Sequence, residues 1–378
     1  MAKRHYSLDT RILSIFFLVA MPFVAFGAYV VVGLASSSLG EAVGSTLEQQ
    51  AVQARLQVER YIGDQFVTLR VLARYPELAQ ALAKAGSARS EDSQRLGQGW
   101  SEADPAIVEG LTGHALGARL RDVTAVRPGW KLLQVVDARG NLVASSSRGG
   151  RFANADSPWF GALSQEPLVE RAYVGDIHRV AGGSLPVLEV AWPVLSPDGA
   201  FQGAVRALID ATDLYGVLAP VRIGRSGHAE LLRASDGLVL ASDQGPRVLE
   251  ARLPGFEMLQ TAMAARRRYW TLPEAKRKGP GDKEEIQEPA RIVAFSAVEQ
   301  VPGVQWLVTV EQDQDEALAP VGKVRRYLWI HFASAFGTVI LLGLYYSFKL
   351  ETPALADEVP IVDELEGRHP DDGGERAA

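Results

Sequence analysis

Aromatic and charged side chains gather between residues 148 and 210 in a combination that suits a small polar ligand. A binding pocket needs apolar walls and a few fixed polar groups that orient the ligand. This segment offers large rings for the walls and guanidinium groups for an anion. The candidate ligand-binding residues are Arg148, Arg151, Trp159, Phe160, Tyr173, Asp176 and Arg206, with His178, Glu189 and Trp192 also in the segment.

Some of these residues also have a purely structural interpretation. Trp159 and Phe160 can close a hydrophobic core, and Asp176 can cap a turn. Arg206 is the sharpest candidate, because alternation along 203–209 places it on one strand face between Ala204 and Leu208. Its partner is either Glu189 of the preceding strand, as a structural ion pair, or an anionic ligand held bidentately.

We predict that the protein is not an enzyme and that it holds no metal or cofactor. Its six histidines never fall at metal-ligand spacings, and the absence of cysteine excludes thiol catalysis, thiolate metal sites and disulfides. The sequence contains no Gly-x-Ser-x-Gly elbow, phosphate-binding loop or His-Glu-x-x-His motif. Acidic pairs such as Glu284–Glu285 lie in polar stretches that are typical of a solvated surface.

The charge of the chain is concentrated at one end. The formal net charge of the 378 residues is −6, and a general nucleic-acid binder needs clustered positive charge, so we expect no nucleic-acid partner. Residues 351–378 alone contain nine carboxylates and two arginines. The Pro-, Gly- and acid-rich composition of 349–378 predicts a disordered acidic tail.

Two charge-free apolar runs, 12–34 and 327–348, predict transmembrane helices. About 20 apolar residues, each rising about 1.5 Å, cross a hydrocarbon core of roughly 30 Å. A cleaved signal peptide is the alternative for the first run, but the run exceeds the roughly 7 to 15 apolar residues of such a peptide. Basic residues within 1–11 place the N-terminus in the cytoplasm, which leaves 35–326 outside and returns the C-terminus to the cytoplasm.

A long helix follows the first apolar run. Apolar residues recur at steps of three and four, which predicts a stalk helix over 40–85. Part of this stripe must pack on the folded domain, and part can pair with a second copy of the chain. The stripe consists of Leu47, Ala51, Ala54, Val58, Ile62, Phe66, Leu69 and Ala73.

The region after the stalk repeats itself at an interval of about 100 residues. The hairpin signature of 136–145 returns at 233–242, with its Gly, Ala and Ser displaced by the same number of positions. Turns at Pro197-Asp198-Gly199 and Val301-Pro302-Gly303 each precede an apolar strand. Two pairs of hairpins in the same order predict two tandem modules of similar antiparallel sheet.

These features resemble the double Cache (dCache) sensor family, which supplies the extracytoplasmic part of many bacterial chemoreceptors and sensor kinases. The resemblance covers about 40–318 and includes Ser157-Pro158-Trp159-Phe160, Tyr173-Val174-Gly175-Asp176 and the linker from Leu218 to His228. It implies an α+β fold in which the stalk helix runs beside two PAS-like modules, a membrane-distal one over 86–220 that binds ligand and a membrane-proximal one over 221–318. It also implies a homodimer in a bacterial inner membrane, with its main domain periplasmic or extracellular.

The chain departs from the amino-acid-binding pattern of that family. Ser157, Phe160 and Leu208 stand where the pattern has an arginine, a tyrosine and an aspartate, whereas Trp159 and Tyr173 match it. With three arginines near these residues, a small organic carboxylate is the first expectation for a ligand. An empty, purely structural pocket is the second.

Only 29 residues follow Lys349, too few for the HAMP helices and signalling domain of a chemoreceptor or kinase. The resulting hypothesis is a membrane-anchored sensor subunit that signals through a partner protein, such as a kinase or chemoreceptor in trans. The alternative is a structural or adaptor membrane protein whose Cache modules bind another periplasmic protein.

Overall fold

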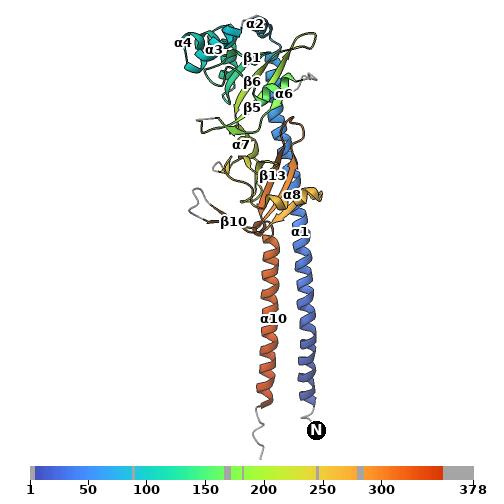
Figure 1. Cartoon of the computed structure of the whole chain (residues 1–378). Helices are drawn as coiled ribbons and strands as arrows, with labels where there is room; N and C mark the ends of the chain where they lie inside the picture. The colour runs from blue at the N-terminus through green and yellow to red at the C-terminus, as the bar shows by residue number, and fades with distance from the viewer. Residues whose placement is uncertain are drawn as a thin grey trace, which may run out of the picture. The chain divides into compact units, whose positions relative to one another are not determined.

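The computed structural model (Figure 1) divides into two units. One unit comprises the terminal segments, up to Val32 and from Lys323, and the other runs from Gly33 to Gly322. Most of the predicted acidic tail lies outside the described residues. The structure describes residues 5–86, 90–165, 172–180, 183–243, 247–278 and 285–351.

The terminal unit contains the apolar segments of two long helices, α1 (His5–Ala73) and α10 (Ala319–Glu351). Both helices have the length and composition to cross a membrane, from Met21 onward in α1 and over Ala319–Tyr345 in α10. The apolar windows of both helices are unburied. The two predicted membrane-spanning segments are therefore present as helices.

The remainder of α1 forms one wall of the folded unit. Six stripe residues are fully buried, namely Leu47, Ala51, Ala54, Val58, Ile62 and Leu69. The sequence predicts one stalk helix over 40–85, but α1 ends at Ala73 and α2 (Pro76–Gly86) begins after a turn. The break lies at Pro76, because proline lacks an N–H donor and disfavours a helical conformation at Tyr75.

The first sheet is antiparallel and has six strands in the order β2-β1-β6-β5-β3, with β4 also paired to β5. Four helices, α2 to α5, precede it in the chain, and α6 lies between β2 and β3. The strands are β1 (Trp130–Asp137), β2 (Leu142–Ser145), β3 (Tyr173–Val174), β4 (His178–Arg179), β5 (Pro186–Leu195) and β6 (Phe201–Asp210). The helices are α3 (Ser90–Glu102), α4 (Pro105–Thr112), α5 (Ala115–Val126) and α6 (Pro158–Ser164).

The second sheet follows in the chain and has five strands in the order β8-β7-β13-β12-β9. A separate hairpin, β10 with β11, pairs only with itself within the described residues. The strands are β7 (His228–Arg233), β8 (Val239–Ser242), β9 (Tyr269–Leu272), β10 (Ala275–Lys278), β11 (Glu285–Glu288), β12 (Arg291–Ala297) and β13 (Trp306–Asp313). The helices of this part are α7 (Asp213–Leu218), α8 (Phe256–Ala264) and α9 (Gln314–Ala317).

The two sheets share one strand order, and the residue pairs of their first hairpins correspond, with one more residue in the second turn. Gln134 pairs with Ser145 in the first hairpin, and Glu230 pairs with Ser242 in the second. In each hairpin, one further residue pair separates this pair from a β-bulge. The turns contain Gly140 and Gly237 at φ +83° and +69°, a left-handed conformation that favours glycine. The predicted α+β class and the repeated hairpins are therefore confirmed.

One face of each sheet packs against α1, which passes beside both sheets (Figure 1). Polar residues of α1 also contact both halves of the unit. Gln65 accepts a hydrogen bond from the indole Nε1 of Trp130 at 2.8 Å, and Glu59 accepts one from the backbone N of Glu299 at 2.9 Å. The opposite face of each sheet is covered by other elements and carries the polar groups described next.

Candidate functional site

The candidate site lies on the face of the first sheet that turns away from α1. Alternation along β1, β5 and β6 places Gln134, Glu189 and Arg206 on this face, as the strand pattern around Arg206 predicts. Their apolar neighbours on the same face form a small core with α6. This core contains Val136, Trp159, Phe160, Leu163, Ala191 and Ala204, with Tyr173 and Phe201 packed against it.

Arg206 is held by two side chains and one ring. Its Nε donates to Oε1 of Glu189 at 2.5 Å, and its Nη1 donates to Oε1 of Gln134 at 3.0 Å. The guanidinium carbon lies 5.4 Å from the centroid of the Trp159 ring, within the range of a cation–π contact. Both ends of the ion pair are largely buried, with side chains 13% and 12% exposed.

Three polar groups of this site have no partner among the described residues. They are Nη2 of Arg206, Oε2 of Glu189 and the hydroxyl of Tyr173. Burial, together with the nearby Glu189 carboxylate, raises the pKa of Tyr173, so this phenol stays protonated at neutral pH. The site therefore offers hydrogen-bond donors and one carboxylate oxygen beside an aromatic wall.

The loop after β2 closes over the guanidinium group. Gly150 has φ +68°, and a Cβ there would lie 2.8 Å from Oε1 of Gln134 and 3.4 Å from Nη1 of Arg206. Its carbonyl accepts a hydrogen bond from the indole of Trp100 at 3.2 Å. Glycine at this position therefore permits the loop to approach the site closely.

Arg148 and Arg151 flank Gly149 and Gly150 in the same loop. They line a surface hollow of about 540 Å³ together with Trp100, Ser101 and Phe152. Arg151 forms an exposed ion pair with Asp156 at 2.9 Å, and Nη2 of Arg148 lies 3.5 Å from the carbonyl oxygen of Ser101, whereas Arg206 pairs with Glu189. The predicted cluster of three arginines is therefore divided between two places.

The fold and the polar site can be compared with known proteins. The Cache domain family model matches residues 35–321, which is most of the chain. The chain belongs to the double Cache family. A search of curated proteins gives no match.

Solved Cache domains include similar structures. The ligand-binding domain of the Pseudomonas fluorescens chemoreceptor CtaA, in complex with L-serine, has 15% identity and a TM-score of 0.43, covering 73% of this chain and 99% of that one. The domain of the Pseudomonas aeruginosa chemoreceptor PctB with L-Arg has 16% identity and a TM-score of 0.44, covering 74% and 98%. The sensor domain of the V. cholerae histidine kinase DctB has 13% identity and a TM-score of 0.46, covering 72% and 98%.

Asp176, a predicted ligand contact, lies at the junction of the two Cache modules. Its Oδ2 accepts a hydrogen bond from Nη1 of Arg233 at 2.9 Å, and its Oδ1 accepts one from the indole Nε1 of Trp306 at 3.0 Å. Both donors belong to the second sheet, where Trp306 and Arg233 are paired.

Phe160 packs edge-to-face on Trp159, with ring centroids 5.7 Å apart.

Gln134 is the site residue that the sequence reading missed. It is a polar residue inside a buried strand, and its amide both accepts from Arg206 and donates to the carbonyl of Gly149 at 2.9 Å. Gln134 and Glu230 occupy the same position of the two Cache hairpins, but the displacement that relates Ser145 to Ser242 would place Gln134 at Leu231, so the strand register and not the sequence repeat shows this equivalence. A polar residue at one place in both copies indicates a shared polar face.

Proposed function

We propose that this Cache protein is a membrane-anchored, extracytoplasmic sensor of a small organic carboxylate. The ligand would bind in the first, membrane-distal module, beside Arg206, Trp159 and Tyr173. The observation that carries the proposal is the uncommitted Nη2 of Arg206, held by Glu189 and Gln134 next to an aromatic wall. A guanidinium with a free, oriented N–H is suited to a carboxylate oxygen.

Family membership supports the sensor role, and the charges of the site support the ligand class. Arg206 and Glu189 neutralise each other, so the carboxylate of a simple ligand would compete with Glu189 for the positive charge of the guanidinium. Arg148 and Arg151, in the loop after β2, would raise the local positive potential rather than contact the ligand. Tyr173 would donate its hydroxyl to the second carboxylate oxygen.

The test is ligand binding by the full chain reconstituted in lipid nanodiscs. A panel of mono- and dicarboxylates, α-amino acids, amines and purines is screened by thermal shift, and hits are titrated by calorimetry. We expect a carboxylate to raise the melting temperature and Arg206→Met to abolish this shift, whereas Arg121→Met on the exposed face of α5 should preserve it. A shift with amines or purines and none with any organic acid would overturn the proposed ligand class.

The output of the sensor is a separate part of the proposal. Ligand binding would displace α10 slightly against α1, by roughly 1 to 2 Å as in other helix-shift switches, and a partner kinase or chemoreceptor would respond. Both termini would face the cytoplasm, and two copies would pair along α1. Ligand-dependent cross-linking between engineered cysteines in the two apolar helices tests this displacement, and the natural chain contains no cysteine that would interfere.

The internal ion pair of the site favours one alternative function. Because Glu189 already neutralises Arg206, the first module is able to fold without a ligand. In that case the protein would act as an adaptor that binds another periplasmic protein. Recovery of a stoichiometric periplasmic protein with the full chain, together with no response to any ligand of the panel, would favour the adaptor.

A further inference from the structure

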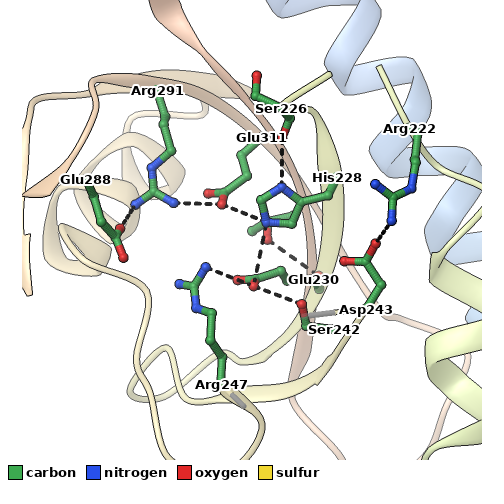
Figure 2. A network of polar contacts seen from close by, with 11 residues as sticks. Arg222, Ser226, His228, Glu230, Ser242, Asp243, Arg247, Glu288, Arg291 and Glu311 are labelled. Carbon is green, nitrogen blue, oxygen red and sulfur yellow. Dashed lines mark hydrogen bonds and ion pairs between the residues drawn. The ribbon is translucent and has the colours of Figure 1, made fainter. Parts of the chain in front are cut away.

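A second polar cluster lies on the corresponding face of the second sheet (Figure 2). His228 and Glu230 alternate on β7, and Glu311 lies opposite His228 on β13. All three residues are buried, and one ligand-type atom of each lies within 4.8 Å of the others. They are called the His–Glu–Glu group below.

The orientation of the histidine ring is fixed by the backbone. The Nδ1 atom of His228 lies 3.0 Å from the carbonyl oxygen of Ser226, so Nδ1 carries the hydrogen and donates it. The other nitrogen, Nε2, lies 3.0 Å from Oε1 of Glu311 and 3.8 Å from Oε1 of Glu230. The lone pair of Nε2 and the two carboxylates repel one another at these distances unless a cation lies between them. This cation is either a proton or a metal ion.

A proton on Nε2 satisfies only part of this group. It makes a hydrogen bond to Glu311 at 3.0 Å, but 3.8 Å is too long for a hydrogen bond to Glu230. The Oε2 atoms of Glu230 and Glu311 also have no hydrogen-bond partner among the described residues, although these residues are 0% and 1% exposed. An unsatisfied buried carboxylate oxygen is costly, whereas a metal ion can draw on oxygens of both carboxylates.

We propose that the His–Glu–Glu group is a site for a divalent transition metal of the zinc class. Zinc binds imidazole nitrogen and carboxylate oxygen at about 2.0 to 2.2 Å, so tetrahedral ligands lie about 3.3 to 3.6 Å apart. The distances of 3.0 and 3.8 Å from Nε2 bracket this separation. One imidazole and two carboxylates leave a fourth position open, as in zinc sites with three protein ligands.

The surroundings of the group suit a bound metal. Metal-binding histidines commonly donate their second ring N–H to a carbonyl, as His228 does to Ser226. The carboxylates are oriented in turn, Glu230 by the hydroxyl of Ser242 at 3.1 Å and Glu311 by Nη1 of Arg291 at 2.7 Å. Such second contacts fix the ligand geometry before the metal arrives.

Two arginines balance the charge around the group. Arg291 bridges Glu311 and Glu288, while Nη1 of Arg247 lies 3.3 Å from Glu230 (Figure 2). With a neutral imidazole, three carboxylates and two guanidiniums leave one negative charge for the cation to offset. The buried Nε and Nη2 of Arg247 lack acceptors among the described residues and suit an anionic fourth ligand such as hydroxide.

The position of the group in the fold also favours binding. Glu230 occupies the place that Gln134 has in the first module, so the His–Glu–Glu group lies on the face equivalent to the carboxylate site proposed there. The second module would therefore bind a metal on the face equivalent to the one where the first module is proposed to bind an organic ligand. This inference stands on the second module alone and does not depend on the proposed carboxylate.

The test uses the full chain, purified without a polyhistidine tag, stripped with a chelator and titrated with Zn²⁺ or Co²⁺ in nanodiscs. We expect one metal ion per chain and the visible absorption of tetrahedral Co²⁺ with nitrogen and oxygen ligands, since the chain has no thiolate to compete. His228→Ala should abolish both. His178→Ala is the matched control and should change neither, because the ring of His178 also contacts a backbone oxygen through Nδ1 but is exposed.

A second pair of variants keeps the proposal testable if His228→Ala does not fold. Glu311→Gln preserves side-chain volume and should remove Zn²⁺ binding, and Ser242→Ala should weaken it roughly 10-fold. Absence of stoichiometric binding to the folded natural chain would overturn the proposal and leave a protonated His228 in the cluster. Unchanged affinity in Glu311→Gln would overturn it as well.

Discussion

Asp176 of the first Cache module accepts a hydrogen bond from the indole Nε1 of Trp306 in the second module at 3.0 Å. The same carboxylate accepts from Arg233, the residue opposite Trp306 in the second sheet. Trp306 is 1% exposed and belongs to the core that both modules share with α1. Asp176 therefore joins the edge of the first module to the start of a central strand in the second.

Replacing Asp176 should loosen the contact between the modules. Asp176→Ala leaves a buried indole N–H without its acceptor and removes one ion pair of Arg233, so we expect a loss of stability of roughly 1 to 2 kcal/mol. Thermal unfolding should also broaden or separate into two transitions, which differential scanning calorimetry measures. Asp156→Ala breaks an ion pair that is exposed at both ends and should change neither property. Loss of carboxylate binding in Asp176→Ala, with an unchanged melting profile, would instead make Asp176 a ligand contact.

The parts of the fold that depend on local patterns were predictable from the sequence. The apolar stripe of α1, the two apolar helices and the repeated hairpins all follow from spacing within a few turns or one strand pair. The end of α1 was also predictable, because Pro76 lies inside the predicted stalk and proline interrupts a helix. Strand alternation further placed Arg206 on the face of Ala204 and Leu208, with Glu189 as one of its two possible partners.

The remaining site contacts join residues that are far apart in the chain. Asp176 meets Trp306 across 130 positions, and His228 meets Glu311 from another strand of the second sheet. A search for histidines at metal-ligand spacings therefore missed the His–Glu–Glu group, whose sequence signal is only His228-x-Glu230 on one strand face. Register between distant strands decides such contacts, and a single sequence contains no direct record of that register.

Gly44 permits a close approach between α1 and β9. A Cβ at this position would lie 2.5 Å from ring atoms of Tyr269, which packs against the main core. We expect Gly44→Ala to destabilise the domain by about 1 to 3 kcal/mol, because the ring must move within a packed region. Gly63→Ala on the same helix meets no atom within 4 Å and should stabilise it by up to about 1 kcal/mol. Thermal melts of both variants check the opposite signs, and a stabilising Gly44→Ala would contradict the packing.

Glu189→Gln should distinguish two classes of ligand at Arg206. The variant removes the negative charge that competes with a ligand for the guanidinium, so a simple carboxylate should bind more tightly. Each 1.4 kcal/mol gained in binding free energy lowers the Kd roughly 10-fold. An α-amino acid should bind more weakly, because its ammonium group loses the Oε2 atom of Glu189. Calorimetric titration of natural and variant chains measures both changes. Tighter binding of an amino acid by Glu189→Gln would contradict this geometry.

Asp236 should contribute to the acid sensitivity of the domain. Hydrogen bonds from Arg233 and Arg252 hold the pKa of Asp236 well below its usual range. The folded chain therefore keeps this carboxylate ionised at pH values where the unfolded chain, with a pKa of about 3.9, has bound a proton. The stabilisation is present at neutral pH and is lost as the pH falls from about 5 towards the folded pKa.

Asp236→Asn removes this contribution. The melting temperature of the variant should lie below that of the natural chain near neutral pH, and the two curves should converge as the pH falls towards about 2. Asp122→Asn, at an exposed position of α5, should give a curve parallel to that of the natural chain. Melting temperatures measured across this range check the prediction. If the melting temperatures of the natural chain and of Asp236→Asn differ by the same amount at every pH, the ion pairs of Asp236 do not contribute to the acid transition.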